Sequence, residues 1–181
     1  MRRVTFAVGI VLLAATCASA DVTDVGANGF DVTIVATIQA ARHEVYRKIV
    51  HSVGEWWSPD HTFSGDPHNL SIEDKPMGCF CEKLPNGGGV RHMEVLTVMP
   101  DKTLVLAGAL GPLQSLAVTA NMRIALEAGG GGTTLTLTYA VGGYLPNGMN
   151  TWAGTLDRVL TEQVKRLKNY VERGDPGAEP K

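Results

Sequence analysis

The segment GMNTWAGTLDRVLTEQVKRLKNYVE (residues 148–172) decides the fold, because it carries the longest helical pattern in the chain. One set of residues recurs at three- and four-residue spacing: Met149, Trp152, Ala153, Leu156, Leu160, Gln163, Val164, Leu167 and Val171. Charged residues take the other side: Asp157, Arg158, Glu162, Lys165, Arg166 and Lys168. A helix with one apolar face must cover an apolar surface. We therefore predict a long C-terminal helix that packs on a sheet.

Strand patterns precede this helix. Residues 30–39 alternate β-branched with polar residues, as a half-buried strand does. Further strand-like runs follow, separated by turn residues: 70–75, 78–84, 90–99, 104–109, 118–128 and 133–142. The stretches 85–89 and 129–132 predict hairpin turns, because glycine supplies the positive φ that such turns require.

Two short helices are expected after the first strand. Residues 41–50 repeat apolar positions at helical spacing, and Ser52 can cap a second turn that carries Trp56 and Trp57. The order is then strand, two short helices, six strands and a long helix. Antiparallel strands bracketed by helices indicate the α+β class, with the helices on one face of the sheet.

Four stretches resemble the SRPBCC superfamily: GEWWSPDHTFSGD (54–66), PMGCFCEKLPNGGGVRHMEV (76–95), LAGALGPLQ (106–114) and LDRVLTEQVKRLKNY (156–170). That group includes START and Bet v 1-like lipid binders, polyketide cyclases and Hsp90-ATPase-activator homologues. The resemblance covers about residues 29–172. It implies a helix-grip fold, in which a curved antiparallel sheet of about seven strands wraps around the C-terminal helix and leaves a cavity. The paired tryptophans and the Gly-x-Phe-x-Glu strand look like the activator-homologue and cyclase-like branch.

The N-terminus predicts export. Arg2 and Arg3 precede an uncharged run that ends in Ala18-Ser19-Ala20, the pattern of a signal peptide cleaved after Ala20. We expect a secreted or periplasmic protein with an N-terminal extension at 21–28, one domain at 29–172 and a disordered tail at 173–181. The charge would be 14 − 18 = −4 after loss of the two arginines from 16 basic and 18 acidic residues. Without a basic excess, nucleic acid is not an expected partner, and no second run is long enough for stable membrane insertion.

Aromatic and apolar loop residues are the candidates for ligand binding. Trp56, Trp57, His61 and Phe63 form the densest aromatic cluster, and we expect one tryptophan in the core and the other at a cavity. In the resembled fold, the segments 108–115 and 142–148 would flank the entrance to the cavity. The candidate gate residues in them are Leu110, Leu113, Gln114 and Tyr144. The alternative is that both segments are ordinary turns packed on the core. Trp152 and Leu156 would lie beneath them.

Glu82 and His92 are candidates for acid–base work, with Tyr144 as a third. A symmetric hairpin centred on Gly87 would put Glu82 opposite His92, Cys81 opposite Met93 and Phe80 opposite Glu94. A cross-strand carboxylate could orient the imidazole and raise its pKa. The alternative, an exposed pair on the outer face, is favoured because a slip of one residue reverses the faces.

Cys79 and Cys81 would be the cysteines left after processing. Exported cysteines usually pair, and residues two apart on a strand face the same side, so a disulfide, two buried thiols or a thiolate metal site all stay open. The metal site lacks a third ligand in sequence, and we expect neither metal nor cofactor.

Three functions remain open. The first is a protein that binds a small hydrophobic or amphipathic molecule in the cavity. The second is a cyclase- or hydrolase-like enzyme that uses the same cavity. The third, a chaperone activator, is least favoured because export would separate the protein from a cytosolic Hsp90.

Overall fold

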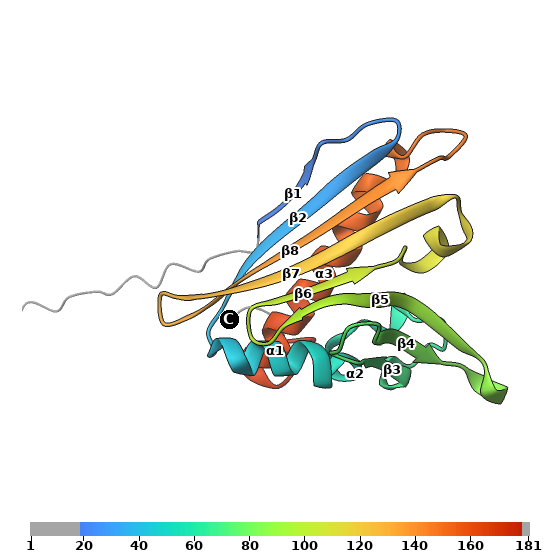
Figure 1. Ribbon diagram of the computed structural model, residues 1–181. Helices are drawn as coiled ribbons and strands as arrows, with labels where there is room; N and C mark the ends of the chain where they lie inside the picture. Colours follow the sequence, from blue (N-terminus) through green and yellow to red (C-terminus); the bar gives the residue numbers. More distant parts are fainter. Residues whose placement is uncertain (1–18, 179–181) are drawn as a thin grey trace, which may run out of the picture.

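A computed structural model describes residues 19–178, and the side chains from residue 24. The predicted signal peptide therefore lies outside the described residues, except for Ser19 and Ala20. Figure 1 shows one curved sheet with the long C-terminal helix α3 (Asn150–Arg173) lying across its concave face. Two short helices, α1 (Arg42–His51) and α2 (Val53–Trp56), lie at one end of the sheet. This is the α+β helix-grip arrangement that the sequence predicts.

The sheet is antiparallel throughout and has the strand order β1-β2-β8-β7-β6-β5-β4-β3. Its strands are β1 (Ser19–Thr23), β2 (Gly29–Ile38), β3 (Leu70–Ile72), β4 (Cys79–Lys83), β5 (Gly89–Met99), β6 (Thr103–Ala107), β7 (Val118–Gly129) and β8 (Gly132–Gly143). Seven of these match the predicted runs. The additional strand, β1, pairs with β2 and begins in the segment that the sequence assigns to the signal peptide.

The predicted turns are present. Gly130 and Gly131 take positive φ between the paired residues Gly129 and Gly132, which makes the two-residue turn that suits the twist of a hairpin. The β4–β5 connection instead contains a 3₁₀ helix, Pro85–Gly87, with Asn86 in the left-handed region. That longer connection shifts the strand register, as described below.

The helix α3 starts two residues later than predicted. Gly148 has φ +78, which no right-handed helix contains, so the helix starts at Asn150. At the other end Gly174 takes the left-handed conformation and its N–H bonds to the Tyr170 carbonyl, a common helix stop. No helix in the described part of the chain is long and apolar enough to cross a membrane.

The space between the sheet and the C-terminal half of α3 is packed almost solid. An apolar void of about 30 Å³ is all that remains between Trp56, Phe80 and Leu160 and their neighbours. Trp56 belongs to this core and donates its indole N–H to the Lys48 carbonyl at 3.0 Å. This part of the space between the sheet and α3 therefore leaves no room for a ligand.

Candidate functional site

A cavity of about 590 Å³ opens beside the N-terminal half of α3. Its walls come from the loop after α2, from β5, from the loop after β6 and from α3 itself. The lining residues are Trp57, Asp60, His61, Thr62, Phe63, His92, Leu110, Gly111, Pro112, Trp152, Thr155, Leu156 and Val159. Segments distant in sequence thus meet at one site.

One wall of this cavity is apolar. Trp152, Leu156 and Val159 recur at helical spacing, so one face of α3 lines the cavity over two turns. Leu110 and Pro112 line it from the loop after β6. Such a wall favours a hydrophobic ligand body.

A β-bulge turns His92 into the cavity. In the β4–β5 ladder Phe80 lies opposite Met93 and Cys81 lies opposite Arg91, so His92 is the extra residue of β5. His92 and Met93 are both buried although they are adjacent in sequence. A bulge re-aims a side chain in this way, and without it His92 would face outward.

The hairpin register predicted from sequence is therefore wrong. The turn is centred on Asn86 rather than Gly87, since Lys83 pairs with Gly89. Glu82 lies opposite Val90, not opposite His92. The two side chains still meet, because the bulge brings His92 back to the inner face, and the favoured alternative of an exposed outer pair is also wrong.

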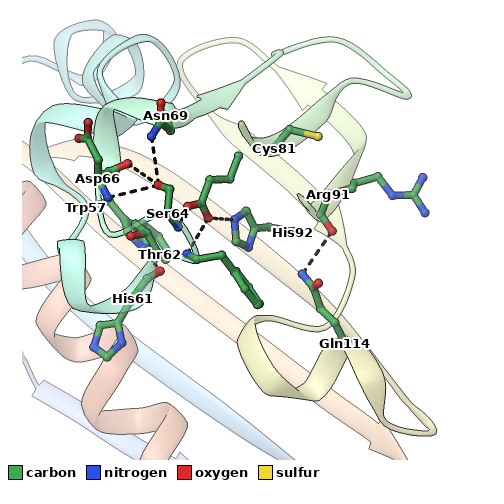
Figure 2. A network of polar contacts seen from close by, with 12 residues as sticks. Trp57, His61, Thr62, Ser64, Asp66, Asn69, Cys81, Arg91, His92 and Gln114 are labelled. Atoms are coloured by element: carbon green, nitrogen blue, oxygen red, sulfur yellow. Dashed lines mark hydrogen bonds and ion pairs between the residues drawn. The ribbon is translucent and has the colours of Figure 1, made fainter. Parts of the chain in front are cut away.

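Glu82 and His92 form a buried pair. The Nε2 atom of His92 lies 2.9 Å from Oε2 of Glu82, with the side chains 5% and 0% exposed. Glu82 also accepts the backbone N–H groups of Phe63 at 3.0 Å and Ser64 at 2.5 Å. Figure 2 shows the strand carrying His92 beside the loop carrying Ser64. Glu82 thus ties this loop to the sheet.

Electrostatics keep Glu82 anionic and His92 neutral. Burial alone would raise the pKa of Glu82, but the hydrogen bonds from Ser64, Phe63 and His92 outweigh it, and that pKa is lowered. Burial lowers the pKa of His92 more than the hydrogen bond and charge of Glu82 raise it. The carboxylate does not raise the pKa of His92 overall, as the sequence suggested that a cross-strand pair could, because burial of the imidazole outweighs it.

Aromatic rings surround this pair. The Phe80 ring lies 5.0 Å and the Phe63 ring 5.9 Å from the His92 ring, centroid to centroid. Trp57 packs edge-on against Phe80 at 5.4 Å and donates its indole N–H to the His61 carbonyl at 3.0 Å. The Phe63 and Phe80 rings thus pack beside the imidazole, whose other side lines the cavity.

The loop after β6 is anchored to the sheet and to the bulge. The Leu110 N–H bonds to the hydroxyl of the buried Tyr139 at 2.9 Å, and burial raises the pKa of that phenol to about 12. The Gln114 side chain donates to the Arg91 carbonyl at 3.2 Å, a contact drawn in Figure 2. Both anchors hold Leu110 and Pro112 over the cavity.

Solved structures share this architecture. A protein from Mesorhizobium loti superposes with TM-score 0.59 at 20% identity over 80% of this chain and 98% of its own. DynU16, from the dynemicin biosynthetic locus, gives 0.58 and 21% over 82% of this chain and 49% of its own. The Aha1 dimer from Colwellia psychrerythraea gives 0.56 and 17% over 80% and 97%.

The chain has the helix-grip fold of these structures. Neither a family model nor a curated protein matches the sequence. At these identities the likeness shows the fold alone, so any function must be argued from this chain's own residues.

Within this helix-grip fold most of the predicted ligand-binding residues line one cavity: Trp57, His61, Phe63, Leu110, Trp152 and Leu156, together with His92. Four lie elsewhere. Trp56 is core, Leu113 is buried beneath its own loop, Gln114 is exposed, and Tyr144 is 70% exposed and outside the lining. Tyr144 is therefore not placed to act as an acid–base group in this cavity, because its side chain is exposed and does not line it.

Sequence reasoning missed other lining residues. Thr155 and Val159 lie three and seven positions after Trp152, so the helical period could have identified them. Asp60, Thr62, Gly111 and Pro112 gave no such signal, because irregular loops have no period that tells which side chains face inward.

Cys79 and Cys81 form a disulfide on β4, with Cα atoms 5.3 Å apart. The adjacent Phe80 and Glu82 face inward and are buried, while the two cysteines are partly exposed on the other face. Within residues 19–178 no cluster of three His, Cys, Asp or Glu side chains is arranged to hold a metal ion.

Proposed function

We propose that this chain is an exported protein that encloses one small hydrophobic or amphipathic molecule. The observation that carries the proposal is a cavity with an apolar wall on α3, lined also by His92 of the buried Glu82–His92 pair. Binding sites for small molecules have this composition, and about 590 Å³ lies within their usual range of ~300–1,000 Å³.

A cavity-filling variant tests this proposal. Thr155 is exposed and lines the cavity, so Thr155→Trp adds a large ring there without removing a core contact. Lys165→Trp, at an exposed position of α3 outside the lining, is the matched control. An environment-sensitive apolar fluorophore should bind the wild type and Lys165→Trp with one-to-one stoichiometry and bind Thr155→Trp at least tenfold more weakly. Equal binding to all three would refute the proposal.

Export is supported by the sequence pattern before Asp21. Expressed with its own N-terminus in a bacterium, the protein should be recovered from the periplasm or medium as the chain starting at Asp21. Recovery of a membrane-bound form that keeps Arg2 and Arg3 would contradict export.

An acid–base enzyme is the second candidate, and the Glu82–His92 pair favours it. A neutral imidazole backed by a carboxylate can accept a proton from a bound molecule. Turnover of an ester or lactone by the wild type but not by His92→Gln would support catalysis. Saturable binding without product would support the binding protein.

A further inference from the structure

The disulfide Cys79–Cys81 lies on the outer face of β4, on the other side of the sheet from the cavity. Both cysteines are partly exposed, whereas Phe80 between them and Glu82 after them are buried on the inner face. A thiol in solution can therefore reach the bond without unfolding of the sheet. Access to a sulfur atom is one requirement of thiol–disulfide exchange.

The fold adds little to the stability of this bond. The bond closes a loop of three residues, so in the chain-entropy model it stabilises the folded chain weakly. Coupling between two equilibria is reciprocal, so the folded chain stabilises the bond by the same small amount. Folding should therefore make reduction only about tenfold less favourable than in a short peptide with the same two cysteines. Exposed disulfides that the fold stabilises weakly are the labile ones.

Two carboxylates flank Cys79. Glu94 lies directly opposite it on β5. On its other side the Glu73 N–H bonds to the Cys79 carbonyl at 3.0 Å, which continues the β3–β4 pairing by one residue. Opposed residues of neighbouring strands share a face, so both carboxylates lie on the side of the disulfide. Lys75 offsets Glu73 in part, through an exposed ion pair at 3.4 Å. The carboxylates disfavour a negative charge on the Cys79 sulfur.

Cationic side chains flank Cys81. Arg91 lies opposite it on β5, and Figure 2 shows the two residues on neighbouring strands. Lys83, two residues further along β4, is exposed on the same face as Cys81. Ser71, the neighbour on β3, carries no charge. A guanidinium or an ammonium group beside a thiol favours the thiolate.

The carboxylates near Cys81 weaken this arrangement little. Arg91 pairs with Glu94 at 3.0 Å, but the two side chains are 67% and 39% exposed, and exposed ion pairs are weak. Arg91 can therefore turn to a thiolate at Cys81 when one forms. Glu82, the next residue along the chain, faces the other side of the sheet, where two backbone N–H groups and His92 hold its charge.

We propose that Cys79–Cys81 is a redox site that takes two electrons from a dithiol. A thiolate of the dithiol attacks the Cys79 sulfur, the bond between the cysteines breaks, and its electron pair stays on Cys81 as a thiolate. The second thiol of the reductant then displaces Cys79. The dithiol becomes a disulfide, and its two protons end on the two cysteines. The better stabilised thiolate leaves faster, which makes Cys81 the leaving group.

Reduction of the native protein tests the exchange. The probe is dithiothreitol, and a peptide of residues 77–84 with the same disulfide is the reference. The equilibrium constant for reduction of the folded protein should lie within about tenfold of that for the peptide. The reduction rate should not change in urea below the unfolding transition. An equilibrium constant about a hundredfold or more below that of the peptide would overturn the site, as would a rate that follows the unfolded fraction.

Single-cysteine variants test the asymmetry. Cys79→Ser leaves the Cys81 thiol and Cys81→Ser leaves the Cys79 thiol, and peptide mapping keeps Cys17 out of the measurement. Alkylation by iodoacetamide, followed against pH, should begin about one pH unit lower for the Cys81 thiol. Equal onsets, or a lower onset for the Cys79 thiol, would overturn Cys81 as the leaving group.

Substitution of Arg91 tests the cause of this asymmetry. Arg91→Gln should remove most of the difference in onset between the two thiols, and Arg91→Lys should restore it, because the effect depends on charge. Arg123→Gln is the matched control, since Arg123 is an exposed arginine on β7, three strands away from β4. It should leave both onsets unchanged. A difference that survives in Arg91→Gln, or one that Arg123→Gln also removes, would contradict the role of Arg91.

Discussion

Gly108 lies against the backbone of His92. A Cβ atom on Gly108 would stand 2.7 Å from the His92 carbonyl oxygen and 2.9 Å from the Met93 Cα, and φ of Gly108 is +145. The loop after β6 therefore reaches the bulge only because residue 108 has no side chain. This contact holds the loop after β6 against His92, which contributes a polar side chain to the cavity.

Gly108→Ala should destabilise the protein by about 2 kcal/mol or more, because the substitution combines a forced backbone shift with an unfavourable φ. Gly111→Ala in the same loop is the control. It also has positive φ (+55) but no atom within 4 Å of the added Cβ, so it should cost only about 1 kcal/mol. Urea unfolding measures the stability of both variants. Equal losses would contradict the close packing of Gly108 against His92 and Met93.

The sequence predicts most of the strands, because alternation along strands such as β2 follows directly from burying one face. It could not predict the position of His92. The bulge inserts a single residue between paired positions, and no periodic pattern marks that insertion. The helical repeat likewise identified Trp152 and Leu156, whereas the loop that carries Tyr144 has no periodic pattern to tell that its side chain is exposed.

The disulfide should contribute little to global stability. It closes a loop of three residues, for which the chain-entropy model gives about 1.5 kcal/mol. Cys79→Ser with Cys81→Ser should therefore unfold at slightly lower denaturant and keep fluorophore binding, since Glu82 and His92 lie on the opposite face. In peptide mapping of the unreduced protein, neither cysteine should be alkylated. Alkylation before reduction would show that the pair is not bonded.

Trp56 and Trp152 should respond differently to truncation. Trp56 packs in the solid core and does not line the cavity, so Trp56→Ala should cost about 3–5 kcal/mol of stability. Trp152 is partly exposed and lines the cavity, so Trp152→Ala should weaken fluorophore binding by about 1–3 kcal/mol and cost less stability. Denaturant unfolding and probe titration on both variants test this. A large stability loss at Trp152 with unchanged probe affinity would mean that its ring is core.

The Glu82–His92 pair should make the protein less stable as pH falls. The pKa of His92 is lowered in the folded state, so the unfolded chain binds a proton first, and stability decreases below about pH 6.5, the ordinary histidine value. The pKa of Glu82 is also lowered, so a second decrease begins below about pH 4.3 and continues through its folded pKa. Exposed His68 has a raised pKa and acts in the opposite direction, so the wild type alone cannot isolate the effect.

The difference in stability between the wild type and His92→Gln isolates the contribution of His92 to this pH dependence. The variant keeps a donor for Glu82 but has no group that titrates at this position, so its unfolding free energy should fall less steeply than that of the wild type as pH decreases below 6.5. The loss near pH 4 should remain, because Glu82 is still present and still accepts the Phe63 and Ser64 N–H groups. Urea unfolding across this pH range measures both slopes. Identical slopes below pH 6.5 would mean that His92 has the same pKa in the folded and unfolded chains, and the imidazole would then not be held neutral in the cavity.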